Sequence, residues 1–142
     1  MKDEGARAYH VVSHSSADYL RQVLEITNGR GVDAILEMLA NANLGHDLKM
    51  LAYRGRVVVV GCRGTVEINP REIMSREAAV FGVLLWRVPE GEASEIYAAV
   101  ETGLGNRTLS PVIASELPLV SAPEAHRRIM EGGARGKIVL AL

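Results

Sequence analysis

Four consecutive valines, Val57–Val60, constrain the fold of this chain more than any other segment. β-Branched residues favour extended backbone, and an uninterrupted apolar run leaves neither face of a strand suited to water. Such a run is typical of a strand in a parallel sheet that helices cover on both faces. We therefore predict a strand over residues 56–61, within an α/β fold.

Extended and helical segments alternate on both sides of this strand. Further strands are expected over residues 8–12, 33–39, 78–85 and 137–140, and an edge or isolated strand over 109–113, which Pro111 interrupts. Helices are expected over residues 17–28 and 92–102, and along the apolar stripe Leu44, Leu48 and Leu51, which Gly55 ends. Two more are expected to begin at proline-containing starts: after Asn69-Pro70, with Glu72 closing a capping box, and after Ser121-Ala122-Pro123. This order favours βαβ units and a parallel sheet.

Composition narrows the class of protein. A chain of 142 residues suits one domain, or a small domain with an appendage. The net charge of −1 gives no general attraction to nucleic acid or acidic lipid. Cys62 is the single cysteine, which excludes an internal disulfide and a paired-cysteine zinc site. No apolar run reaches the ~18 residues of a membrane helix, and no secretory signal is recognisable. We expect a reducing, cytoplasmic setting and no membrane partner.

Three segments follow predicted strands, where ligands bind in open α/β sheets: residues 39–43, 61–65 and 83–86. Gly61 and Gly64 would let the backbone approach a ligand closely, and Arg63 could meet a phosphate. The alternative is an ordinary strand-to-loop turn with a solvated arginine. Cys62 is interpreted as a small packing residue rather than a reactive thiol.

Other polar residues give weaker signals. The four histidines show no metal-binding spacing. Glu37, inside an apolar strand, could be a buried acid with a partner, but a charge at the strand end is favoured. Arg127, Arg128, Arg135 and Lys137 are expected to form a solvated face. The sequence contains neither a GxGxxG nor a GxSxG nor a P-loop motif.

Two blocks, residues 37–44 and 55–71, strongly resemble the zeta-crystallin quinone oxidoreductases, which are zinc-free medium-chain dehydrogenases/reductases. Ala125-His126 and residues 136–140 resemble the helix and strand that end members of that family. The similarity runs through nearly the whole chain. Cys62 stands where a serine would be expected, which leaves backbone contacts unchanged.

The resemblance implies an NADPH-dependent enzyme that passes a hydride to quinones. It also implies a homo-oligomer, a dimer or tetramer, assembled through the strand Ala79–Leu85. Members of the family have been linked to RNA binding, for which the composition here gives no independent support.

The resemblance also implies a cofactor site, carried over by position. Ser13 and Asp18 match positions near the adenosine, and Asn41 or Asn43 falls in the turn that faces the cofactor. The nicotinamide side would be lined by Val60, Gly61, Cys62 and Arg63, together with Val83, Leu84 and Leu85. No catalytic general acid is implied.

Relatives of this kind are more than twice as long. The resemblance therefore implies a partial Rossmann-like, doubly wound parallel sheet that lacks its first two strands and their glycine-rich turn. Residues 1–104 would form the partial nucleotide-binding domain, and 105–142 a segment that joins the catalytic domain in full-length relatives. Strand 8–12 would then pair directly with strand 33–39, pair with another chain, or belong to a fragment whose other half exists elsewhere.

We expect no catalysis by this polypeptide alone, and poor cofactor affinity, because a pyrophosphate-binding turn normally contributes strongly to binding. The alternative function is a non-catalytic truncated paralogue or splice form that acts as an oligomerisation module.

Overall fold

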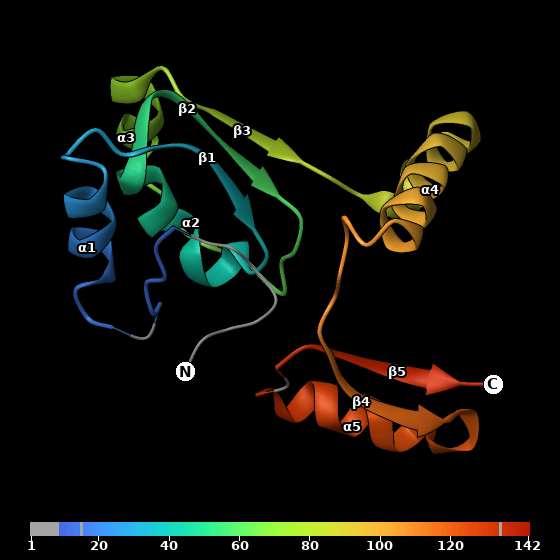
Figure 1. Cartoon of the computed structure of the whole chain (residues 1–142). Coiled ribbons are helices and arrows are strands. Elements are labelled where there is room, and N and C mark those ends of the chain that lie inside the picture. The colour runs from blue at the N-terminus through green and yellow to red at the C-terminus, as the bar shows by residue number, and fades with distance from the viewer. Residues whose placement is uncertain (1–8, 15, 134) are drawn as a thin grey trace. The chain divides into compact units, whose positions relative to one another are not determined.

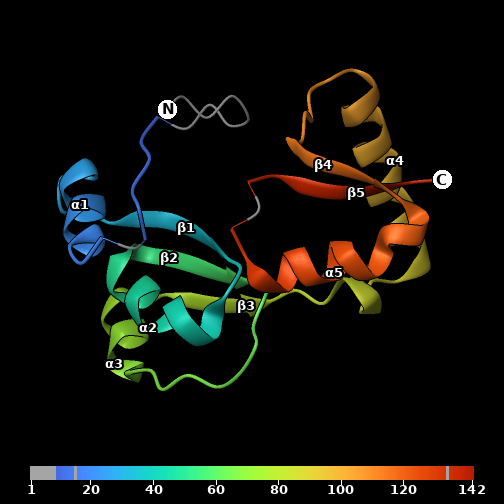
Figure 2. The same cartoon turned by 90° about the horizontal axis from the view of Figure 1, so that it is seen from below.

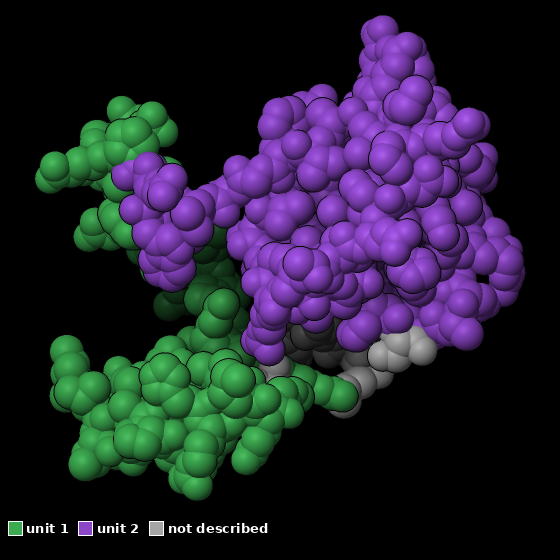
Figure 3. All heavy atoms as spheres, turned by 180° about the vertical axis from the view of Figure 1, so that it is seen from behind, with its two compact units in different colours: residues 1–8, 89–142 green, residues 9–88 purple. Residues whose placement is uncertain are grey.

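A computed structural model describes residues 9–14, 16–133 and 135–142. Contacts within the chain divide it into two compact units, Tyr9–Val88 and Pro89–Leu142 (Figure 3). The division predicted at residues 104 and 105 refers to domain membership in longer relatives, and it stays a prediction.

The unit Tyr9–Val88 is built around a three-stranded parallel sheet (Figure 1). Its elements are α1 (Tyr19–Ile26), β1 (Val32–Glu37), α2 (Ala40–Met50), β2 (Leu51–Val59), α3 (Pro70–Arg76), β3 (Ala79–Gly82) and a 3-10 turn, η1 (Leu85–Arg87). The strand order is β1-β2-β3. The predicted parallel α/β arrangement is confirmed for this unit.

Helices α2 and α3 lie on one face of this sheet (Figure 2). Leu48, Leu51 and Val57 are buried between the layers and form the centre of the core. Alternate residues of the strands point away from these helices, and Leu36 on β1 is 74% exposed. Because the described helices of this unit cover one face, the valine run is only partly buried, and Val60 is exposed. The expectation of cover on both faces was wrong for this unit.

Several predicted boundaries differ from the structure. Helix α2 ends at Met50, not at Gly55, because Leu51 already adopts extended dihedrals of φ −65° and ψ 140°. Gly55 instead lies within β2, where a side chain would come within 3.0 Å of the carbonyl oxygen of Val32. Strand β3 ends at Gly82, so Val83–Leu85 continues outside the sheet.

The predicted strand 8–12 is absent from its described part, Tyr9–Val12, and Ala8 lies outside the described residues. A strand needs a neighbour to accept and donate its backbone hydrogen bonds. In the described sheet β1 pairs with β2 alone, so direct pairing of 8–12 with β1 does not occur.

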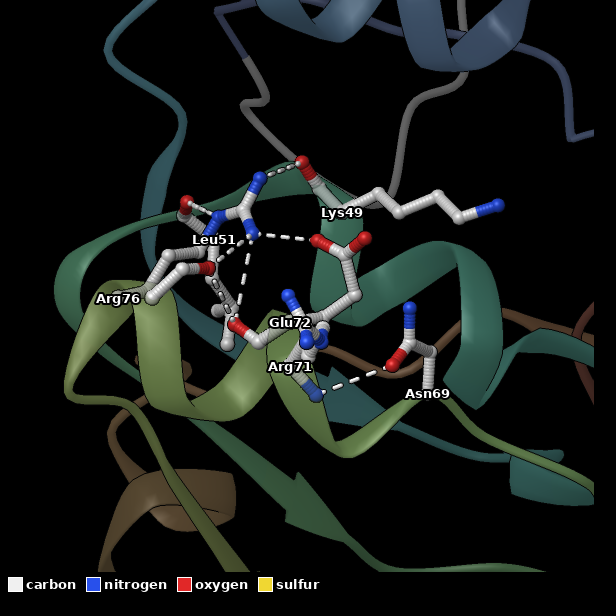
Figure 4. Close-up of polar contacts among 7 residues, drawn as sticks. Lys49, Leu51, Asn69, Arg71, Glu72 and Arg76 are labelled. Carbon is white, nitrogen blue, oxygen red and sulfur yellow. Dashed lines mark hydrogen bonds and ion pairs between the residues drawn. The ribbon is translucent and has the colours of Figure 1, made fainter.

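Arg76 joins three elements of the first unit (Figure 4). Its guanidinium donates to the carbonyl oxygens of Lys49 (3.0 Å) and Leu51 (2.9 Å), at the end of α2. It also forms an ion pair with Glu72, one turn earlier on α3, at 2.6 Å. These carbonyls have no partner within α2, so the cation satisfies them and interacts favourably with the helix dipole.

The predicted start of α3 is confirmed in part. The side chain of Asn69 accepts from the backbone N–H of Arg71 at 3.1 Å, and Pro70 occupies the first turn. Glu72 pairs with Arg76. The predicted closing contact of a capping box therefore gives way to a stronger, charged partner.

The unit Pro89–Leu142 contains α4 (Glu90–Gly105), β4 (Ile113–Pro118), a 3-10 turn η2 (Leu119–Ser121), α5 (Ala122–Glu131) and β5 (Lys137–Ala141). Strands β4 and β5 are parallel, and α5 connects them and packs against both. The strand predicted over 109–113 thus lies later, at Ile113–Pro118. Arg127 and Arg128 are exposed and paired with Glu124, in agreement with a solvated face.

We predict that Arg76→Ala destabilises the chain by about 1–2 kcal/mol, because two carbonyls at the end of α2 lose charged hydrogen-bond partners. Arg71→Ala, which removes an exposed arginine from the same helix, should change stability by less than about 0.5 kcal/mol. Urea unfolding followed by circular dichroism measures both. Equal effects of the two substitutions would show that general charge, not the contacts of Arg76, stabilises α3.

Candidate functional site

The carboxyl ends of the three parallel strands meet at one edge of the sheet. The register places Glu37 beside Val59, and Val59 beside Gly82. Beyond these pairs the backbone N–H groups of Val60 and Gly61 donate to the carbonyl oxygen of Glu37, at 2.8 and 3.2 Å. The N–H of Val83 donates to the carbonyl oxygen of Val59 at 2.9 Å. The segments predicted to carry a ligand therefore start side by side.

Asn41 links the loop after β1 to the loop after β2. Its Oδ1 accepts from the backbone N–H of Arg63 at 2.8 Å and lies 3.8 Å from the thiol of Cys62. The N–H of Ala40 donates to the carbonyl oxygen of Gly61 at 3.0 Å. Asn41, Gly61, Cys62 and Arg63 thus form one connected group, which we call the Asn41 cluster.

Gly61 is required by the close approach of these two loops. A Cβ atom built there would overlap the carbonyl oxygen of Met38 and lie 3.0 Å from its carbon. Gly64 is different, since the nearest atom to its Cβ would be Asn41 Cβ at 4.0 Å, and a Cβ on Gly82 meets nothing within 4 Å. The edge is therefore tight under Gly61 and open at Gly64 and Gly82.

Glu37 is a buried acid with partners, so its interpretation as a charge at the strand end was wrong. Only 5% of its surface is exposed. Its Oε1 accepts from the backbone N–H of Leu39 and from Asn43 Nδ2, the latter at 3.1 Å. Asn43 and Asp47 are four residues apart and share one face of α2. That polar pair was the signal in the sequence that could have indicated a buried partner for Glu37.

Asp47 lies on α2, one turn after Asn43, and was not singled out from the sequence. It is 4% exposed, and its Oδ2 has no hydrogen-bond partner among the described residues. Burial, and then the neighbouring Glu37 carboxyl, raise the pKa of Asp47 to about 7. Burial, followed by the charges of Asp47 and Glu37, also raises the pKa of Tyr19.

The remaining predicted residues lie elsewhere. Ser13 and Asp18 precede α1, and the carboxylate of Asp18 accepts from Ser16 Oγ at 2.5 Å and from Gln22 at 2.6 Å. Those hydrogen bonds, Ser16 first, lower the pKa of Asp18 to about 2. Leu84 and Leu85 follow β3 and are exposed. The structure therefore connects Asn41, Gly61, Cys62 and Arg63, whereas Ser13 and Asp18 belong to the surroundings of α1.

A Rossmann-type site implies a nicotinamide cofactor. The residues at the ends of β2 and β3 fit the nicotinamide ring of that cofactor. The open space at Gly64 and Gly82 and the exposed apolar side chains of Val60 and Val83 suit a flat ring. The glycine-rich turn that receives a pyrophosphate does not occur in this sequence. Among the described residues no three His, Cys, Asp or Glu side chains gather as metal ligands, and no helix is long and apolar enough to cross a membrane.

Comparisons with known proteins agree on one family. The family model for zinc-binding dehydrogenases matches residues 7–140. The quinone oxidoreductase of Homo sapiens is 43% identical over 136 residues, which are 95% of this chain and 41% of that protein. The chain therefore spans about two-fifths of the length of the curated relatives it matches. The predicted resemblance to quinone oxidoreductases is confirmed.

Solved structures give the same fold. An NAD-dependent alcohol dehydrogenase superposes with a TM-score of 0.77 at 20% identity, over 92% of this chain and 37% of that one. A mycobacterial quinone oxidoreductase superposes with a TM-score of 0.71 at 22% identity, over 92% of this chain and 41% of that one. The chain thus has the fold of part of a larger α/β oxidoreductase with a parallel sheet, and the predicted partial Rossmann-like fold class is confirmed.

We predict that Gly61→Ala destabilises the chain by about 1–3 kcal/mol, because the added methyl group has to displace the backbone at Met38. Gly64→Ala should cost less than about 0.5 kcal/mol, since its Cβ meets only ordinary contact. Chemical denaturation of the two variants measures the difference. A harmless Gly61→Ala would mean that the two loops are farther apart than described.

Proposed function

Because this chain belongs to the zinc-binding dehydrogenase family, we propose that the protein it forms is an oxidoreductase that transfers a hydride from NADPH to a quinone. The observation that carries the proposal is the 43% identity to a quinone oxidoreductase, which extends over 95% of this chain. The preference for NADPH, the absence of a structural or catalytic zinc and a cytoplasmic location belong to the same proposal and rest on the resemblance.

A bound nicotinamide supplies the hydride, and the protein supplies position and surroundings. The Asn41 cluster offers a backbone loop held in place by hydrogen bonds, against which the cofactor would lie. Val60 and Val83, at the ends of β2 and β3, offer apolar surface that keeps water from the reacting ring. Ser13 and Asp18 would contact the adenosine, and Asn43 supports the turn through Glu37. No side chain of the cluster needs to act as a general acid.

Oligomerisation through β3 and the residues that follow it is also proposed. Phe81 of β3 is 54% exposed, and Leu85, in the η1 turn that follows, is 63% exposed. The outer edge of β3 has no neighbouring strand among the described residues. Apolar side chains on an unpaired edge favour pairing with another strand. The RNA binding that the resemblance implies stays a prediction.

We predict that NADPH added to the 142-residue chain shifts the amide NMR signals of Asn41, Gly61–Arg63 and Val83–Leu85 only near millimolar concentration, about −4 kcal/mol. Binding is weak because the pyrophosphate has no glycine-rich turn to receive it. NADPH with an ortho-quinone should show no oxidation by this chain alone. Signal changes confined to other residues would contradict the proposed site.

A chimera tests the reaction itself. Residues 7–140 would replace the matching part of the human quinone oxidoreductase, with the unaltered human protein as the control. The chimera is expected to oxidise NADPH with an ortho-quinone. A chimera that folds and binds NADPH but shows no oxidation would contradict the proposed reaction and favour the non-catalytic assembly module.

A further inference from the structure

Two carboxyl groups are buried in the interior of the first unit, Glu37 at the end of β1 and Asp47 on α2. Glu37 and Asp47 are 5% and 4% exposed. Asn43 donates to Glu37 at 3.1 Å and shares one face of α2 with Asp47, one turn later, so the helix brings the two carboxyls together. Ionised carboxylates only accept hydrogen bonds, so two of them cannot bond to each other without a proton. Two adjacent buried negative charges would also repel strongly and lose their hydration.

The hydrogen bonds around the pair indicate which carboxyl carries the proton. Glu37 Oε1 already accepts two donors, the N–H of Leu39 and the side-chain amide of Asn43. These donors stabilise a negative charge on Glu37. Asp47 Oδ2 is buried and accepts from no group among the described residues. A proton on Asp47 Oδ2 would give that atom a partner and Glu37 a third donor.

The surroundings of the pair contain few other titratable groups. Tyr19 of α1 lies edge-on to the ring of His46, with ring centres 5.8 Å apart. Burial, and then the charges of Asp47 and Glu37, raise the pKa of Tyr19. His46 precedes Asp47 on α2 and is exposed. From the sheet, β2 contributes the apolar Val57 and Val59 to the core on this side. No described cation is paired with either carboxyl, so a proton is the charge that would neutralise them.

Glu37 connects this pair to the candidate site. Its side chain holds the first turn of α2 through Leu39 and Asn43, and its carbonyl oxygen holds Val60 and Gly61. Asn41 lies between Leu39 and Asn43 and accepts from the backbone of Arg63. A change in the charge or position of the Glu37 side chain therefore affects its hydrogen bonds to Leu39 and Asn43, and through them the position of Asn41.

We propose that Asp47 is a carboxylic acid that donates its proton to Glu37, and that this acid pair positions the turn between β1 and α2 so that Asn41 holds the Arg63 loop against the cofactor. The mention of a cofactor rests on the proposed function, whereas the acid pair stands on the contacts of this unit alone. Glu37 and Asp47 are thus positioning residues.

The proposal gives a direction for the dependence on pH. The pKa of Asp47 is about 7 in the folded chain, above its ordinary value of 3.8. The folded state therefore holds the proton more tightly than the unfolded state. The stabilisation is fully present below about pH 4 and is lost as the pH rises to about 7, where Asp47 gives up its proton and the turn loosens.

The test follows the carboxyl NMR signals of the 142-residue chain and the hydrogen exchange of the Leu39 and Arg63 amides, between about pH 5 and about pH 8. The Asp47 carboxyl is expected to titrate near pH 7. Exchange at both amides, corrected for its intrinsic pH dependence, should accelerate about tenfold or more across that range. The amide of Arg71, bonded to Asn69 on α3, should not change and serves as the internal reference.

Two substitutions separate the roles of the acids. Asp47→Asn offers Glu37 a permanent amide donor, so protection of Leu39 and Arg63 should persist at every pH. Glu37→Gln replaces the neighbouring charge by an amide that can donate, and the titration of Asp47 should move toward its ordinary range. Asp33→Asn is the matched control, because Asp33 is exposed and already ionised beside Arg30. Its pH profile should equal that of the unaltered chain.

An Asp47 signal that titrates in the ordinary acid range of the unaltered chain would overturn the proposal, and this result does not require any variant to fold. So would unchanged pH dependence in Asp47→Asn. If the acid pair titrates as expected but NADPH shifts no signal in the Asn41 cluster at any pH, the pair stands and the proposed function fails. If NADPH shifts these signals equally at pH 5 and pH 8 while the pair titrates, the positioning role is wrong.

Discussion

The parallel pairing of β1 with β2 is the constraint on which the rest of the first unit depends. Parallel strands need a connection that returns to the starting edge, and α2 provides it. The pairing sets Glu37 beside Val59, so the loops after both strands leave the sheet together. The apolar centre at Leu48, Leu51 and Val57 then seals the helix onto the strands. Every contact of the Asn41 cluster follows from that alignment.

Much of this arrangement could be predicted from the sequence. The valine run specified a strand, and Asn69-Pro70 specified the start of α3, because both signals are local and act through backbone dihedrals. Ligands bind beyond the carboxyl ends of parallel strands, and this rule predicted from the sequence that residues 39–43 and 61–65 lie close together. The hydrogen bond between Asn41 and the backbone of Arg63 joins these two segments.

The rest depends on partners that a single sequence does not reveal. Residues 8–12 have strand composition, but a strand also needs a neighbour, and Tyr9–Val12 has none in the described sheet. Gly55 resembled a helix terminator because glycine often ends helices. Glycine also allows two backbone segments to approach closely, and this is its role here, inside β2 and next to Val32. Glu37 resembled a surface charge because its burial depends on the packing of α2 against β1, which the residues around Glu37 do not reveal.

The departures from local rules are concentrated at one place. Three such residues surround the turn between β1 and α2. Gly61 has no room for a side chain, Glu37 is an acid buried at the end of a strand, and Asp47 is a second buried acid whose Oδ2 has no hydrogen-bond partner among the described residues. Each costs stability, since buried acids lose hydration and glycine loses backbone entropy. Proteins commonly retain such costs where a site requires them. The same turn presents Asn41 to the loop of Arg63, so the energetic cost and the candidate site coincide. This coincidence, rather than any single residue, makes the edge formed by β1 and β2 the part of the chain where its chemistry is expected.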